Sequence, residues 1–113
     1  MNQTFTFIET PIFTDRIVDL ISDDELAEFQ VDLAQNPEKS GPIRGTGGLR
    51  KVRWNLEGKG KSGGIRIMYL PLKVHGHIYL IFVFAKNESD NLSASETREL
   101  KKIAEAIKRE HKK

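Results

Sequence analysis

The sequence predicts an α+β fold, in which a small antiparallel sheet is combined with an N-terminal helical hairpin and a C-terminal helix. Three patterns predict it: helical apolar spacing in the first third, strand-like apolar segments in the middle, and helical spacing again at the end. The resulting order is strand, two helices, three strands and helix. Three consecutive strands joined by short loops favour an antiparallel meander. We expect the first strand to join this sheet and the helices to cover one of its faces.

The first strand and the helical hairpin lie at the start of the chain. Residues 4–9 are rich in Phe, Thr and Ile, which favours a strand, and Pro11 suits the first turn of a helix. Ser22 and Glu25 have the spacing of a capping box, so a second helix is predicted to begin there. Pro37 should end it, because the residue before a proline disfavours helical backbone. The predicted apolar faces are Phe13, Ile17, Leu20 and Ile21, followed by Leu26, Phe29 and Leu33.

A glycine-rich loop over residues 39–48 separates the hairpin from the next strand. That strand, residues 49–56, alternates between an apolar side and a cationic side. The apolar side is Val52, Trp54 and Leu56, and the cationic side is Lys51 and Arg53. Alternate side chains on a strand stand about 7 Å apart, so the two cations are predicted to be neighbours.

Two longer strands and a helix complete the predicted fold. Residues 65–72 and 78–85 are apolar on both faces, which is typical of central strands, although Arg66 interrupts the first run. A turn around Gly76 joins them. Ser93 begins a second capping box, and the helix that follows has a narrow apolar stripe of Leu100, Ile103 and Ile107.

Composition excludes several classes of protein. The 113 residues contain no cysteine, which excludes disulfides, thiolate metal sites and cysteine nucleophiles. The longest apolar run is far shorter than a membrane span, and the amino terminus lacks the pattern of a signal peptide. We therefore expect one domain over residues 1–113 that is cytoplasmic and has no membrane partner.

Charge is segregated along the chain. Residues 1–40 hold nine acids and two bases, whereas residues 41–86 hold one acid and nine bases. The middle segment therefore has few internal partners for its cations. It should project a positive field that attracts phosphates or an acidic protein.

Familiar ligand-binding motifs are incomplete. Gly60-Lys61-Ser62 would need a glycine at position 55 to form a phosphate-binding loop, and Asn55 stands there. The glycines at 45–48 do not complete a dinucleotide-binding pattern either. Two histidines flank Gly76 in a turn, and His111 is expected in solvent within the basic tail. We predict no metal site and no cofactor.

Four cations lie on successive strands or just past their ends. They are Lys51, Arg53, Arg66 and Lys86. Because neighbouring strands are about 4.8 Å apart, these side chains can converge on one face of the sheet. Arg66 is the most informative, since an arginine in an apolar strand must meet an anion, open onto a cleft or form an internal ion pair. Glu9 and Glu88 are the candidate partners for that pair. Trp54 and Tyr69 are either core residues or a surface for stacking bases.

Three segments together resemble a known family. Residues 45–53 (GTGGLRKVR), 58–69 (GKGKSGGIRIMY) and 86–88 (KNE) are similar to the HigB-type branch of the RelE/ParE toxin superfamily. The resemblance implies a RelE-like fold and a ribosome-dependent mRNA endonuclease of a type II toxin–antitoxin system. It also implies a cognate antitoxin, which usually carries a helix-turn-helix domain. The toxin is then expected to contact operator DNA only through this antitoxin.

The resemblance also implies residue roles. RelE-like nucleases carry catalytic cations at the positions of Lys51, Arg53, Arg66 and Lys86. RNA supplies its own nucleophile, the 2′-hydroxyl, so cleavage needs no metal. We expect Lys51 to act as general base, Arg53 and Arg66 to hold the phosphate, and Lys86 to act as acid or as an electrostatic contact. The residues expected to contact RNA or the ribosome are Arg50, Lys59, Lys61 and Asn87.

The chain departs from the family at two points. Asn87 stands where several RelE-like enzymes have a second arginine, and no tyrosine follows Tyr79 near the carboxyl end. Two other classes therefore stay open: a ParE-like inhibitor of DNA gyrase, and a non-catalytic module that binds RNA or protein. The clustered cations favour the nuclease.

Overall fold

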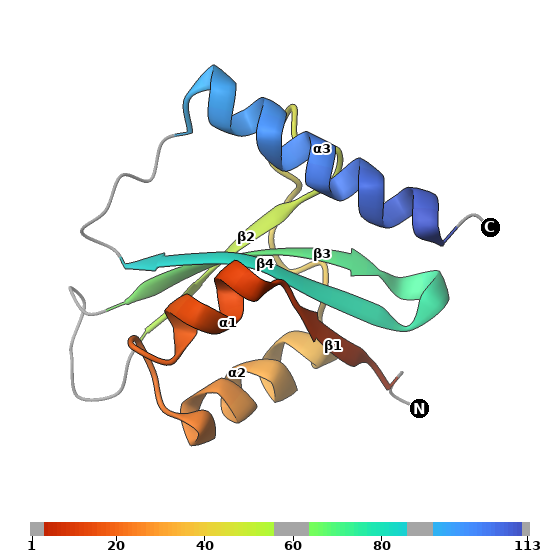
Figure 1. Cartoon of the computed structure of the whole chain (residues 1–113). Coiled ribbons are helices and arrows are strands. Elements are labelled where there is room, and N and C mark those ends of the chain that lie inside the picture. The colour runs from red at the N-terminus through yellow and green to blue at the C-terminus, as the bar shows by residue number, and fades with distance from the viewer. Residues whose placement is uncertain (1–3, 56–63, 86–91, 112–113) are drawn as a thin grey trace.

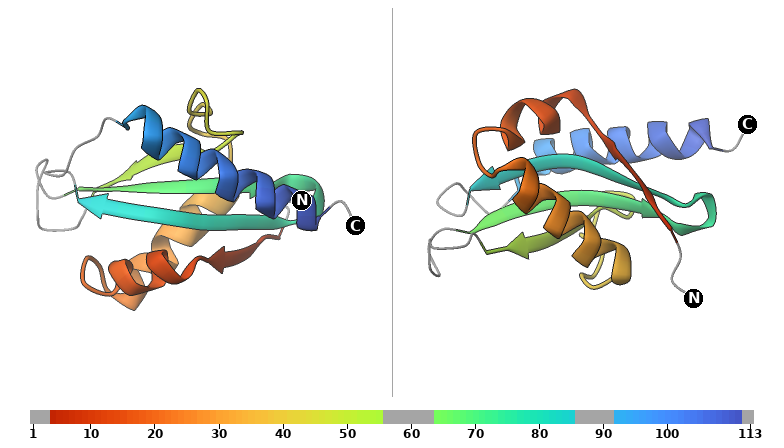
Figure 2. Two further views of the ribbon diagram at one scale, coloured as in Figure 1. Left: turned by 45° about the horizontal axis from the view of Figure 1, so that its top comes forward. Right: turned by 90° about the horizontal axis from the view of Figure 1, so that it is seen from below.

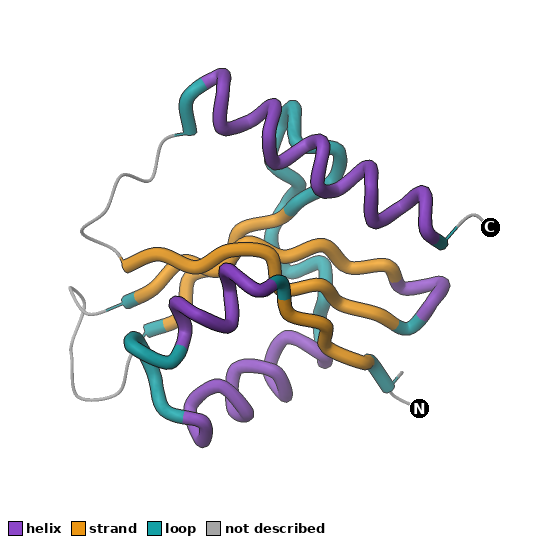
Figure 3. The backbone as a smooth tube through the Cα atoms, viewed as in Figure 1, coloured by secondary structure: helices purple, strands orange, loops and turns teal. Residues whose placement is uncertain are grey.

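A computed structural model of the chain describes residues 4–55, 64–85 and 92–111. The chain passes through a strand, two helices and three further strands to a final helix (Figures 1 and 3). The elements are β1 (Thr6–Glu9), α1 (Pro11–Ile17), α2 (Asp23–Gln35), β2 (Arg50–Trp54), β3 (Ile65–Leu72), a short 3-10 turn η2 (Lys73–His75), β4 (His77–Ala85) and α3 (Ala94–Glu110). This is the predicted order.

The sheet has four strands in the order β1-β4-β3-β2. The antiparallel meander of β2, β3 and β4 is confirmed, and the two doubly apolar strands are central. The first strand also joins the sheet as predicted, but it runs parallel to β4, with Phe7 opposite Ile78. The predicted α+β fold class is thus confirmed, with a sheet that is mixed.

The helices cover both faces of this sheet. Figures 1 and 2 show α1 and α2 on one side and α3 on the other. Two separate apolar clusters correspond to these two sides. The expectation that helices would cover one face is therefore wrong. The reason is that β3 and β4 are apolar on both faces, and each face must be removed from water.

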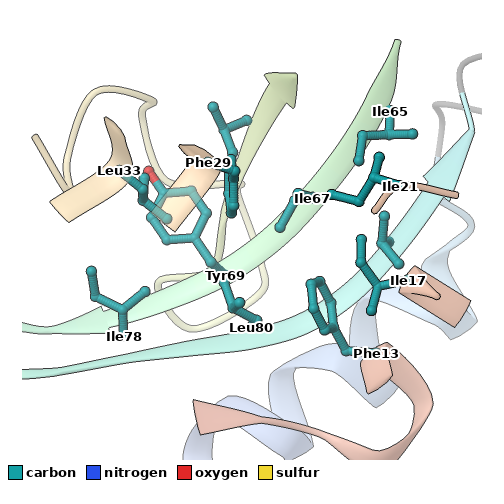
Figure 4. Packing of buried hydrophobic residues seen from close by; sticks show 12 residues of the cluster. Phe13, Ile17, Ile21, Phe29, Leu33, Ile65, Ile67, Tyr69, Ile78 and Leu80 are labelled. Carbon is teal, nitrogen blue, oxygen red and sulfur yellow. The ribbon is translucent and has the colours of Figure 1, made fainter. Parts of the chain in front are cut away.

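The core on the α1–α2 side contains the predicted helix faces (Figure 4). Phe13 of α1 and Phe29 and Leu33 of α2 are fully buried there against the sheet. Tyr69 is buried beside them, and this burial raises the pKa of its hydroxyl above 10.0. Trp54 packs edge-on against Phe29, with the ring centroids 5.5 Å apart. Tyr69 and Trp54 both belong to this core.

The second cluster lies between the sheet and α3. Leu100 and Ile107 pack there against buried sheet residues, as their spacing predicts, whereas Ile103 stays 39% exposed. The register between β3 and β4 shifts by one residue, because Met68 pairs with Phe82 whereas the next residue, Tyr69, pairs with Leu80. Ile81 is therefore an extra residue in β4. Such a bulge turns two successive side chains to one face. The residues of the cluster are Leu49, Leu70, Ile81 and Ala104, with Leu72, Tyr79 and Phe82 at its margin.

The glycine-rich loop before β2 packs on α3. Gly45, Gly47 and Gly48 have positive φ angles of 82°, 76° and 108°, which confirms that these glycines shape a turn. A Cβ at Gly45 would stand 3.1 Å from Cγ2 of Thr97. Lys108 Nζ donates a hydrogen bond to the carbonyl of Gly47. The loop thus ties the start of β2 to the final helix.

Both predicted capping boxes are present. The backbone N–H of Glu25 donates to Ser22 Oγ at 3.1 Å, and the Glu25 carboxylate accepts from the backbone N–H of Ser22. Ser93 and Glu96 form the same pair at the start of α3. Hydrogen bonds from the Ser93 backbone and side chain lower the pKa of Glu96 below 4.5.

Candidate functional site

Three of the predicted catalytic cations share one face of the sheet. In the β2–β3 register, Lys51 pairs with Met68 and Arg53 pairs with Arg66. Residues directly opposite each other on antiparallel strands point to the same side. Lys51, Arg53 and Arg66 therefore lie together on the side that α3 covers, which we call the cation face.

Arg66 is buried, with 4% of its surface exposed, whereas Arg53 is exposed and Lys51 is half-buried. Its cross-strand neighbours are Arg53 on β2 and Phe84 on β4. Glu9, one of the two carboxylates considered as an ion-pair partner for Arg66, lies on β1, and β4 separates β1 from β3. The Glu9 carboxylate accepts a hydrogen bond from Thr14 Oγ1 at 2.7 Å. Glu88, the other, lies outside the described residues.

An apolar groove of about 470 Å³ adjoins the cations. Its floor includes Met68 and Phe84, which pair with Lys51 and Arg66. α3 forms one wall, where Glu96 and Glu99 are the charged residues. The remaining lining residues are Ile12, Ile81, Phe82, Leu92, Ser95, Leu100 and Ile103. The cation face can therefore hold an anionic group beside a surface that accepts apolar or planar groups.

The other predicted contact residues are not brought to this face. Arg50 pairs with Tyr69 and so points to the α1–α2 side. There its guanidinium donates to the carbonyl of Ser40 and lies 3.6 Å from the carboxylate of Glu38. Its assignment to RNA or ribosome binding stays a prediction. Lys59, Lys61, Lys86 and Asn87 lie outside the described residues.

The three histidines of the chain meet at the C-terminal end of α3. Nδ1 of His77 lies 2.9 Å from Nε2 of His111, and Nδ1 of His111 lies 3.0 Å from the carbonyl oxygen of Ile107. The rings of His75 and His111 have centroids 4.6 Å apart. His111 is half-buried, so the expectation that it lies in solvent is wrong. Nothing in the sequence signals this contact, because 34 residues separate His77 from His111.

No group of three side chains able to hold a metal ion occurs within residues 4–55, 64–85 and 92–111. None of the helices in these segments has the length and apolar character that crossing a bilayer requires. The side chains that the register brings to the cation face, Lys51, Arg53 and Arg66, offer cationic groups that can bind an anion electrostatically.

Comparison with known proteins identifies the family. Residues 19–113 match the family described as the RelE toxin of the RelE/RelB toxin–antitoxin system. The chain belongs to the RelE toxin family. RelE toxins generally cleave mRNA in a ribosome-dependent manner, and membership implies a cognate antitoxin.

Solved structures of E. coli RelE share the fold of this RelE-family chain. A double arginine-to-alanine mutant in the free state superposes with a TM-score of 0.55 at 20% identity, covering 96% of this chain and 98% of that chain. The isolated E. coli RelE toxin gives a TM-score of 0.56 at 17% identity, covering 94% and 98%. At these identities the likeness shows the RelE-like fold.

Proposed function

We propose that this RelE-family chain is a HigB-type toxin that cleaves mRNA on the ribosome by metal-independent attack of the 2′-hydroxyl. The observation that carries the proposal is the convergence of Lys51, Arg53 and Arg66 on the cation face. Cleavage of this kind needs a positioned phosphate, removal of the 2′-hydroxyl proton and stabilisation of additional negative charge. A cluster of cations beside a groove meets the first and third needs.

The three cations have different chemical capacities. Guanidinium groups stay protonated and can bind a phosphate through two parallel hydrogen bonds, so Arg53 and Arg66 hold the scissile phosphate. Lys51 is the one amine of the three, and a lysine amine that has first released its proton can act as general base, which is the role we assign to it. Lys86, which follows β4 directly in the chain, serves as the acid or as a further electrostatic contact.

The partners follow from the same proposal. Lys59 and Lys61, which lie between β2 and β3 in the sequence, contact ribosomal RNA, as do Arg50 and Asn87. The ribosome presents the mRNA in a bent conformation that this small set of groups then cleaves. The cognate antitoxin carries a helix-turn-helix domain, through which operator DNA is contacted.

The test is mRNA cleavage in a translating extract. We expect new mRNA ends that disappear when translation is stopped. Their chemistry is diagnostic, because 2′-hydroxyl attack leaves a 2′,3′-cyclic phosphate or 3′-phosphate and a 5′-hydroxyl. A 5′-phosphate would contradict the mechanism.

Variants of the cation face test the site itself. Arg53→Ala and Arg66→Ala should each lower the cleavage rate by about 10²–10³, by analogy with loss of one donor to a developing negative charge. The matched control is Lys39→Ala combined with Lys102→Ala, which removes two exposed cations outside the cation face. Full activity in the Arg66→Ala, Lys86→Ala double variant would rule out this site. Induction of DNA damage without mRNA cleavage would instead support a gyrase inhibitor, and ribosome binding without cleavage would support a binding module.

A further inference from the structure

The C-terminal end of α3 lies over the turn that joins β3 and β4 (Figures 1 and 2). Among the residues of α3, all of which the structure describes, Ala104 is the one that is buried. Two polar contacts add to this apolar packing near the end of the helix. Lys108 Nζ donates to the carbonyl of Gly47, and the ring of His111 meets the ring of His77 on β4. The attachment of this end of α3 therefore depends in part on the histidine contact.

The hydrogen bonds of His111 fix which ring nitrogens carry protons. Its Nδ1 lies 3.0 Å from the carbonyl oxygen of Ile107, which can only accept, so Nδ1 carries the hydrogen. In the neutral ring Nε2 is then an acceptor. Nδ1 of His77 lies 2.9 Å from this Nε2 and is therefore the donor. The bond requires Nε2 of His111 to be free of a proton.

The pair can take up one further proton and keep its bond. On Nε2 of His77 the added proton leaves the bond intact, because the charged ring still donates from Nδ1. A second added proton must go to Nε2 of His111, which is the acceptor of the bond. Two N–H groups on two positively charged rings would then face each other across the 2.9 Å contact. The bond is compatible with one positive charge on the pair and incompatible with two.

Other groups around the pair set its electrostatic surroundings. His75 of η2 places a third imidazole against His111, with ring centroids 4.6 Å apart. The ring of Tyr79 on β4 lies 5.8 Å from that of His111. Tyr79 is uncharged near neutral pH, because burial, followed by the charge of Glu110, raises the pKa of its hydroxyl above 10.0. The carboxylate of Glu110 favours the first positive charge on the cluster, and each further charge adds repulsion.

The lysines of the neighbouring elements are engaged elsewhere. Lys73 of η2 lies 3.3 Å from the carboxylate of Glu38. Lys108 of α3 is bound to the loop before β2. The last two lysines of the chain, at positions 112 and 113, lie outside the described residues.

We propose that His77 and His111 form a proton-operated clasp, which holds the C-terminal end of α3 on the β3–β4 turn and releases it when the pair takes up its second proton. The released end can carry a proton on each ring, so it binds more protons than the closed clasp. By linkage the clasp weakens as the pH falls through the range in which histidine titrates, about pH 6.5. Release exposes Ile107 and the apolar sheet residues beneath it. The clasp is independent of the proposed cleavage chemistry, and its test needs no RNA.

The proton positions are tested by the imidazole nitrogen chemical shifts in NMR spectra. At about pH 8, where histidine is neutral, both His77 and His111 should be in the Nδ1–H form. An Nε2–H form of His111 in the folded protein would overturn the proposal.

Hydrogen exchange measures the release of the helix end. Between about pH 8 and about pH 5, the protection factors of the amides of residues 108–111 should fall by about tenfold, which corresponds to the loss of roughly one hydrogen bond. The amides of β3 should keep their protection. A fall of equal size in β3 would show a general loss of stability, and it would overturn the proposal.

The decisive variant is His111→Gln, which removes the titrating ring and keeps an acceptor, the amide oxygen, for Nδ1 of His77. Its protection at residues 108–111 should no longer depend on pH. His75→Gln is the matched control, because it makes the same substitution in the same cluster at a ring outside the His77–His111 bond. It should retain the tenfold fall. Retained pH dependence in His111→Gln, or its loss in His75→Gln, would overturn the clasp.

A second variant covers a helix end that is already released in His111→Gln at about pH 8. In His77→Gln the amide can donate to the neutral ring of His111 and can turn its oxygen toward the charged ring. Protection at residues 108–111 should again be independent of pH. A tenfold fall in this variant would overturn the clasp.

Discussion

Arg53 and Arg66 lie directly opposite each other on β2 and β3, with Arg66 buried and Arg53 exposed. Like charges in this relationship destabilise a sheet, because their side chains start only about 5 Å apart. On the same face, Met68 and Phe84 are the cross-strand neighbours of Lys51 and Arg66. A local arrangement that opposes stability is typical of functional sites.

Replacing Arg53 by a neutral strand-forming residue should therefore stabilise the fold. Arg53→Thr removes the repulsion and is expected to raise the free energy of unfolding by about 0.2–1 kcal/mol in urea titrations. The same variant should lose cleavage activity. Lys39→Thr, which removes a cation paired with Asp32, is the control and should not gain stability. A less stable Arg53→Thr protein would contradict the interpretation of the pair.

Replacing Arg50 should destabilise the fold, in contrast to replacing Arg53. Its guanidinium donates to the Ser40 carbonyl and pairs with Glu38, and 16% of its side chain is exposed. Arg50→Ala should lower the free energy of unfolding by about 1 kcal/mol, because the Ser40 carbonyl loses its donor. Urea titration measures this loss. Ribosome binding, measured separately at several salt concentrations, tests the predicted contact with RNA, since a lost phosphate contact would weaken the salt dependence. Unchanged stability would contradict the structural role.

The loop that ties β2 to α3 should be sensitive at Gly45. Gly45→Ala must hold a φ of +82° that alanine disfavours, and its Cβ would crowd Thr97 at 3.1 Å. We expect a loss of at least about 1 kcal/mol, visible as a lower thermal midpoint by circular dichroism. Gly41→Ala, in the same loop but in open space, should keep the wild-type midpoint. Equal midpoints for the two variants would show that the loop does not require this conformation.

The cap of α3 should depend on pH through Glu96. Its pKa is lowered below 4.5 in the folded protein by hydrogen bonds from Ser93. A lowered pKa stabilises the fold above the unfolded value, and this stabilisation is lost as the pH falls through the folded pKa. The stability difference between wild type and Glu96→Gln should therefore shrink as the pH falls from neutral to values below 4.5. Urea titrations across this range measure it, with Glu105→Gln as the control in the same helix. A difference that does not change with pH would contradict the assignment.

Part of the cation face could be predicted from local sequence pattern alone. The alternation around Lys51 and Arg53, and the interruption of an apolar run by Arg66, are visible in the sequence because strand periodicity is local. The pairing of Arg53 with Arg66 required the register of β2 and β3.

Local sequence patterns were enough to predict where the helices begin, which segments are strands and which strands bear cations. Capping boxes, apolar spacing and turn residues act over a few residues, so Ser22 and Ser93 begin their helices as predicted. The three-dimensional structure was needed to show that α3 covers the face opposite α1 and α2, that β1 runs parallel to β4, and that His77 meets His111. These relationships join residues far apart in the chain, and they arise from burying both faces of one sheet at once, a condition that no local pattern expresses.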